Sequence, residues 1–153
     1  MNTVLLLYLV LFVAPISNLF HELGHMLGAV FVKADKITIL LGRGKKVYKL
    51  YYKHIDIQIG WLFFTTGLTV SNRTIPYRSS EIVCITLWGP LLNAIIVFIS
   101  YLIYQSIPNA YTLVFMLYNG WLFVINCIPF KIGKQESDGY IIIREIVKKM
   151  YTS

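Results

Sequence analysis

The chain has 153 residues, of which 57% are hydrophobic, and it carries a formal net charge of +7. Its mean hydropathy is +0.65. The length corresponds to one domain, and the apolar share exceeds that of an ordinary soluble domain. Because the basic residues are confined to two segments, we attribute the charge to membrane topology and expect no nucleic-acid partner. Both cysteines lie in apolar stretches, so no disulfide framework is expected.

Three apolar stretches explain the hydrophobic excess, at residues 3–32, 82–104 and 111–130. Each is close to or above the roughly 20 residues that a helix needs to cross a bilayer. Three buried helices of a soluble protein are the alternative, but little polar sequence remains to cover them. We therefore predict an α-helical membrane protein with three transmembrane helices, folded as a single domain over residues 1–153.

The first stretch contains the sequence HELGH at residues 21–25. Residues four apart in a helix project from nearly the same face, so His21 and His25 can reach one metal ion. Glu22 can act as general base toward a water on that ion, which is the HExxH pattern of zinc peptidases. Residues 3–20 carry no charge, so this polar cluster in an apolar helix indicates a functional site.

The region 36–70 is predicted to form a small antiparallel sheet. Residues 37–41, 46–52 and 55–59 are rich in β-branched and aromatic side chains. Residues 61–70 fit either a further strand or a segment that dips into the membrane interface. We expect the sheet at the cytoplasmic surface. There, the sheet between residues 36 and 59 either presents an edge strand to which an extended substrate adds, or merely caps the membrane surface.

All 14 Lys and Arg lie between the first two apolar stretches or after the third. With three spans, these two segments are on the same side of the membrane. The positive-inside rule makes that side cytoplasmic and places the N-terminus outside, as in a multi-pass protein of the cell membrane. Residues 140–150 are predicted to form an amphipathic helix that lies on the membrane surface.

A zinc site of the peptidase type needs a third protein ligand and an open position for water. Asp138, which follows the third apolar stretch, can complete a site of two histidines and one carboxylate. Glu136 is a competitor for this role. A surface turn is the alternative reading of Asp138 followed by Gly139.

The second apolar stretch contains the sequence GPLLN at residues 89–93. Gly89 permits close approach of another helix. Asn93 is a polar group in an apolar span, which fits either an interhelical hydrogen bond or an active-site contact.

HELGH, GPLLN and an N-x-x-P segment leading to Asp-Gly, in this order, resemble the site-2 protease family of intramembrane zinc metallopeptidases. The resemblance covers about the whole chain as a minimal three-helix core. It implies one zinc ion (Zn2+) per chain, held by His21, His25 and Asp138. It also implies that Glu22 is the general base.

The resemblance extends to the expected substrate cleft. It implies that Asn93, in the helix that also carries Gly89, helps to bind substrate, and that Asn126 and Pro129 shape the cleft. The chain departs from the family at Ser137, where many members have Leu. The interval from Pro129 to Asp138 is also longer than in typical members.

These observations predict an intramembrane zinc metalloendopeptidase that hydrolyses a membrane protein or membrane peptide near the cytoplasmic face. The expected partners are this substrate and the lipid bilayer, and regulation is expected from a membrane partner or from substrate access. A non-catalytic zinc-binding member of the same fold, acting as a chaperone or immunity factor, is the alternative, but an intact HExxH argues against it. A metal transporter is a third reading, disfavoured because transport pathways have several polar residues along their depth.

Overall fold

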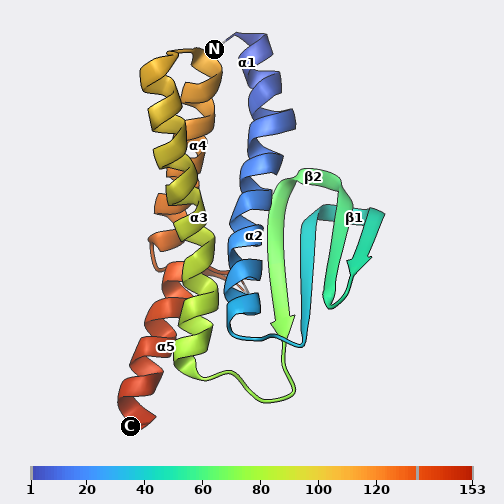
Figure 1. Ribbon diagram of the computed structural model, residues 1–153, viewed down its shortest axis with the longest axis vertical. Helices are drawn as coiled ribbons and strands as arrows, with labels where there is room; N and C mark the ends of the chain where they lie inside the picture. The colour runs from blue at the N-terminus through green and yellow to red at the C-terminus, as the bar shows by residue number, and fades with distance from the viewer. Residues whose placement is uncertain (1, 134, 153) are drawn as a thin grey trace.

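The computed structural model describes residues 2–133 and 135–152. Three long helices stand side by side, and a small sheet lies along one of them (Figure 1). Within the described residues, the helices Thr3–Phe31, Ser79–Ser106 and Ala110–Cys127 are long and apolar enough to cross a membrane. The predicted mostly helical fold with an antiparallel sheet inserted after the first helix is thereby confirmed. The orientation of the helices in a membrane stays a prediction.

The first long helix consists of three consecutive segments, namely α1 (Thr3–Tyr8), the π-helical turn η1 (Leu9–Val13) and α2 (Ala14–Phe31). Pro15 lies in the first turn of α2. Proline has no backbone N–H and its ring crowds the preceding turn, which disturbs the regular helical hydrogen bonds. In η1, just before Pro15, the helical turn is wider than in an α-helix, and the Ala14 N–H bonds to the Leu9 carbonyl. The helix continues through Pro15 by this local adjustment.

The remaining helices and short strands are α3 (Ser79–Ser106), α4 (Ala110–Cys127), β3 (Lys131–Ile132), β4 (Gln135–Glu136) and α5 (Asp138–Thr152). In the most apolar part of the three long helices, the buried share of residues is 17%, 28% and 11%. Large side chains such as Phe12, Phe98 and Leu117 face outward. Because so much apolar surface is unfavourable in water, this exposure supports a surrounding bilayer over the soluble alternative.

The sheet is formed by β1 (Lys36–Tyr52) and β2 (Ile55–Asn72), which pair antiparallel. Both strands bend, so the first half of β1 lies between the two halves of β2. Thr38, for example, is paired with Val70 on one side and with Asp56 on the other. Residues 61–70 are therefore strand. The sheet lies along the side of α2 and not across the end of the helices (Figure 1).

The packing of α2 against α3 depends on glycines that bring the two backbones together. A Cβ atom at Gly24 would lie 2.3 Å from the Trp88 carbonyl oxygen, and one at Gly28 would lie 2.8 Å from Ile85 Cα. Both distances are too short for any side chain. Small residues at such a spacing are typical of helix contacts in membranes, where close backbone approach replaces the hydrophobic effect.

We predict that Gly24→Ala destabilises the fold by roughly 1–3 kcal/mol, because the added methyl group would overlap the backbone of α3. Gly120→Ala is the matched control, since a Cβ atom there would meet only Val97 Cγ2 within 4 Å, at 3.8 Å. Thermal unfolding in detergent should give a lower midpoint for Gly24→Ala and an unchanged or higher midpoint for Gly120→Ala. Equal midpoints would contradict this account of the helix contact.

Candidate metal centre

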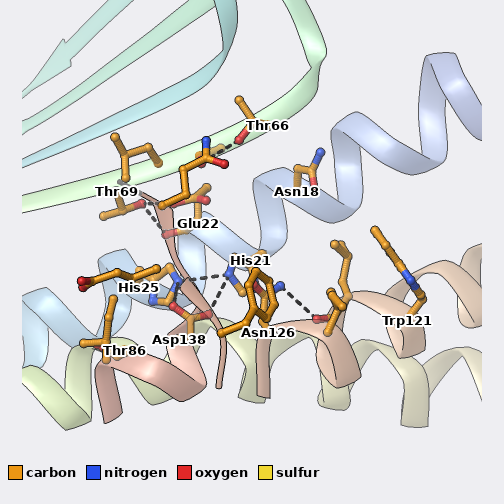
Figure 2. A pocket seen from close by; sticks show the side chains of 18 of the residues that line it. Asn18, His21, Glu22, His25, Thr66, Thr69, Thr86, Trp121, Asn126 and Asp138 are labelled. Atoms are coloured by element: carbon orange, nitrogen blue, oxygen red, sulfur yellow. Dashed lines mark hydrogen bonds and ion pairs between the residues drawn. The ribbon is translucent and has the colours of Figure 1, made fainter. Parts of the chain in front are cut away.

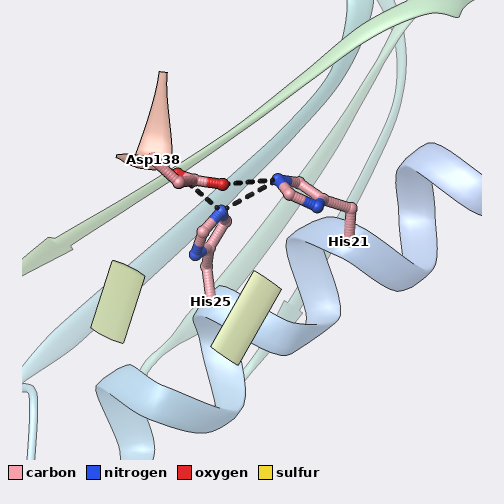
Figure 3. A group of neighbouring side chains, drawn as sticks. All are labelled: His21, His25 and Asp138. Atoms are coloured by element: carbon pink, nitrogen blue, oxygen red, sulfur yellow. Dashed lines mark hydrogen bonds and ion pairs between the residues drawn. The ribbon is translucent and has the colours of Figure 1, made fainter. Parts of the chain in front are cut away.

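His21 and His25 project from one face of α2, as their spacing predicts. Their rings meet edge to face with centroids 4.7 Å apart, and their Nε2 atoms are 3.1 Å apart. The two side chains are 11% and 12% exposed. Figure 3 shows both rings turned toward the same point, where Asp138 approaches from another element.

Asp138 is the first residue of α5, and the docking of α5 against α3 brings it to α2. Its Oδ2 lies 3.2 Å from His21 Nε2, and its Oδ1 lies 3.4 Å from His25 Nε2. Within the described residues, these three side chains form a group that could hold a metal ion. The structure thus brings together the three residues that the sequence suggests as ligands.

The hydrogen bonds around the two imidazoles favour a cation at this point. His25 Nδ1 lies 3.0 Å from the Ile85 carbonyl oxygen and His21 Nδ1 lies 2.7 Å from Asn93 Oδ1. If each Nδ1 donates to its oxygen, both Nε2 atoms turn lone pairs toward a carboxylate. Asp138 Oδ2 is buried and has no hydrogen-bond partner among the described residues. Such a set of acceptors needs a proton or a metal ion among them, so the residues fit a metal.

Glu22 is 5% exposed and lies in the same cleft, where β2 holds its carboxylate (Figure 2). The Thr69 hydroxyl donates a hydrogen bond to Glu22 Oε2 at 2.6 Å, and its oxygen also lies 3.1 Å from the Glu22 carbonyl oxygen. The backbone of β2 also comes close, since a Cβ atom at Gly67 would lie 2.5 Å from Glu22 Oε1. A larger residue at position 67 would displace the Glu22 carboxylate from this place.

Ser137 accounts for how α5 begins at Asp138. Its hydroxyl donates to the Ile128 carbonyl at 2.7 Å and accepts from the backbone N–H groups of Phe130 and Tyr140 at 3.0 and 3.2 Å. It therefore caps the N-terminus of α5 and ties it to the end of α4. The departure from Leu at this position has a structural role.

Two further glycines allow close approaches around the three candidate ligands His21, His25 and Asp138. A Cβ atom at Gly89 would lie 2.4 Å from the His25 imidazole, and one at Gly139 would lie 2.1 Å from the Cys127 carbonyl oxygen. Gly139 has no positive φ angle, so it serves contact between α5 and the end of α4 and not a sharp turn. Gly89 provides space for a candidate ligand, in addition to letting α2 approach α3.

A cavity of about 510 Å³ opens beside the metal group, between α2, the second half of β2, α4 and the start of α5 (Figure 2). Asn126 lines it, with its Nδ2 2.9 Å from the Leu122 carbonyl oxygen. Pro129 is exposed and Asn93 is fully buried, and neither lines this cavity. Asn93 contacts His21, whereas the resemblance implies that it contacts substrate.

Glu136, the competitor of Asp138, has its carboxylate engaged by two cations. Lys131 Nζ lies 2.7 Å from Oε1, and Arg144 forms an ion pair with Oε2. The hydrogen bond from Lys131 lowers the pKa of Glu136 below its usual value; desolvation opposes this shift, and the charge of Arg144 adds to it. Glu136 lines the cavity, but its charge is already compensated.

The chain matches no protein-family model and no curated protein. Membership of the site-2 protease family therefore stays a prediction from the three motifs.

Two residues near the site were not identified from the sequence. Thr69 lies in the stretch whose structure was ambiguous, and no local pattern marks it. Asn119 is fully buried in α4 and bonds to Asn93. A polar side chain in an apolar span is the signal that drew attention to Asn93, and the same signal applies to Asn119.

We predict that Asp138→Asn loses its bound metal and that Glu136→Gln keeps about one ion per chain, because Asp138 faces both histidines and Glu136 is ion-paired. Elemental analysis of the purified proteins after dialysis measures the metal content. The two variants each exchange one carboxylate for an amide of the same size, so each controls for the other. Retention of metal by Asp138→Asn together with its loss from Glu136→Gln would reverse the assignment.

Proposed function

We propose that the chain is a zinc metalloendopeptidase that cleaves a peptide bond of a membrane protein or membrane peptide. The observation that carries the proposal is the placement of Glu22 in one cleft with the group of His21, His25 and Asp138. Structural zinc sites are closed by four protein ligands, whereas catalytic sites have three and leave a position for water. The apolar helices around the cleft support a substrate that arrives from the bilayer.

Zinc is the ion that we infer for this group. Two imidazole nitrogens and a carboxylate oxygen are a known catalytic zinc set, with bonds of about 2.0–2.2 Å. In a tetrahedral site, such bonds keep the ligand atoms about 3.3 Å apart. The two Nε2 atoms are 3.1 Å apart, close to this spacing, and each also has a different oxygen of the Asp138 carboxylate nearby, at 3.2 Å for His21 and 3.4 Å for His25. When bound, zinc supplies a Lewis acid that polarises the scissile carbonyl and acidifies the attacking water.

We assign Glu22 as the general base. Its carboxylate lies in the cleft, with Oε2 bonded to Thr69 and Oε1 against Gly67. From this position, it takes a proton from the attacking water and delivers it to the nitrogen of the leaving amine. The carboxylate is thereby regenerated after each turnover. Thr69 and Gly67 restrict its orientation, which supports a role in positioning the base.

We predict that Glu22→Gln keeps about one zinc ion per chain while cleavage falls by roughly 10²–10⁴-fold, because the amide cannot accept the water's proton. His21→Ala should lose both zinc and cleavage. Zinc content and a proteomic comparison of membrane peptides from cells expressing each variant measure the two properties. Wild-type cleavage by Glu22→Gln would refute the mechanism. Zinc binding without any cleavage by the wild type would favour the peptide-binding alternative.

The second half of β2 supports a binding mode for the substrate. A helical substrate must unwind before attack, because its peptide bonds are enclosed in its own hydrogen bonds. Residues 65–69 of β2 line the cavity beside Glu22, and in the described sheet Thr65 and Thr66 have no paired residue in β1. We propose that an extended substrate adds to this edge through main-chain hydrogen bonds. The edge was expected among the first three predicted strands, and the strand beside the site is instead the stretch that had been ambiguous.

We predict that Thr66→Pro lowers cleavage roughly tenfold at unchanged zinc content, because it removes a main-chain donor worth about 0.5–1.5 kcal/mol beside the substrate. Val47→Pro is the matched control: Val47 is exposed in β1, has no paired residue in β2 and does not line the cavity. The same peptide comparison, with circular dichroism as a test of folding, measures the effect. If both folded variants cleave like the wild type, the edge does not bind substrate.

A further inference from the structure

A chain of buried amides links His21 to the backbone of α4. Asn93 Oδ1 lies 2.7 Å from His21 Nδ1, and Asn93 Nδ2 lies 2.9 Å from Asn119 Oδ1. Asn119 Nδ2 in turn donates to Ser17 Oγ and to the Phe115 carbonyl oxygen, each at 2.8 Å. Asn93, Asn119 and Ser17 are all 0% exposed, so solvent water does not compete for these bonds.

The Phe115 carbonyl determines the direction of the bonds that lead from it to His21. A carbonyl oxygen only accepts, so Asn119 turns its NH₂ group toward Phe115 and its oxygen toward Asn93. Asn93 must donate to that oxygen, which leaves Asn93 Oδ1 facing His21. Because this oxygen also only accepts, the facing Nδ1 carries a proton. In the neutral imidazole, Nε2 then keeps its lone pair.

His25 reaches the same state without such a chain, because its Nδ1 faces the Ile85 carbonyl directly at 3.0 Å. A backbone carbonyl cannot exchange its acceptor for a donor, whereas an unrestrained Asn93 amide can flip. A flipped amide would offer NH₂ to His21 Nδ1 and favour the tautomer with the proton on Nε2. That nitrogen faces Asp138, and a protonated Nε2 cannot bind a metal.

We propose that Asn119 is a positioning residue of the metal centre. Through Asn93, it holds His21 in the tautomer that offers Nε2 to the metal, and Ser17 supports it by accepting its second N–H. We call the hydrogen-bonded series from Asn119 through Asn93 to His21 the amide relay. Within the described structure, none of Asn93, Asn119 and Ser17 lines the cavity, so the relay acts on a ligand and not on the substrate. The inference rests on the metal centre of the proposed function but not on peptide hydrolysis, and its tests read metal affinity and tautomer.

Asn119→Leu tests the relay, because it removes the group that orients Asn93 and keeps a side chain of similar size. The Zn²⁺ affinity of the full chain in detergent is measured by competition with a chromophoric chelator. We expect it to fall about 10–100-fold, as is typical when a ligating histidine loses its outer partner. Ser100→Ala, which removes another buried hydroxyl from α3, is the control and should leave the affinity unchanged. Wild-type affinity of a folded Asn119→Leu protein would overturn the proposal.

A second substitution separates positioning from packing. Asn93→Asp places at position 93 a carboxylate that only accepts, so it holds the proton on His21 Nδ1 without help from Asn119. Asn93→Asp combined with Asn119→Leu should therefore recover most of the zinc affinity that Asn119→Leu loses. A double variant that folds and binds zinc as weakly as Asn119→Leu would show that Asn119 acts through packing, which also overturns the proposal.

The tautomer can be read directly in the wild type, so the test does not depend on the folding of a variant. The chain has three histidines, and nitrogen-15 spectra of the histidine-labelled, metal-free protein can resolve them. We expect His21 to carry its proton on Nδ1 in the wild type and to shift toward the Nε2 form in Asn119→Leu. A wild-type His21 that is protonated on Nε2 alone would overturn the relay. Absence of peptide cleavage by the wild type would count against the proposed function alone.

Discussion

The close contact between α2 and α3 is the constraint on which the candidate metal centre depends. Gly24 lets the two backbones meet, and Gly89 leaves space for the His25 ring. Because the helices are this close, His21 reaches Asn93 and the His25 ring reaches a backbone carbonyl of α3. The orientation of both imidazoles is thus a consequence of helix packing. A methyl group at either glycine would act on the chemistry of the site through this contact.

Polar groups inside apolar helices are unfavourable unless they have hydrogen-bond partners. Two sets of such groups in this structure differ in how completely they are hydrogen-bonded. The amides of Asn93 and Asn119, with Ser17, bond to one another and to backbone, and they need no ligand. In the second set, His21 faces Asp138, whose carboxylate Oδ2 has no hydrogen-bond partner in the described chain. The first set needs no further partner, whereas the second has the composition of a group that could hold a cation. This contrast separates the support of the site from the site itself.

The differences between the resemblance and the structure have physical reasons. Ser137 replaces an apolar residue but makes three hydrogen bonds that hold the start of α5, so a longer segment before Asp138 still delivers its carboxylate to α2. Asn93 lies behind the candidate ligands, where its amide contacts His21 and does not line the cavity. The strand edge beside Glu22 comes from the second half of β2, because both strands bend around one another.

The sequence by itself determined the three apolar helices, the sheet region and the pairing of His21 with His25. These features depend on local periodicity and spacing, and two residues four apart share a helix face whatever surrounds them. The Asp-Gly motif suggested Asp138 as a metal ligand. The reason to prefer it over Glu136 comes from the structure, where Glu136 forms ion pairs with Lys131 and Arg144. The strand formed by residues 61–70, the support of Glu22 by Thr69 and the amide relay were decided by tertiary structure alone. Each requires the relative rotation and depth of segments far apart in the chain, which no local pattern encodes.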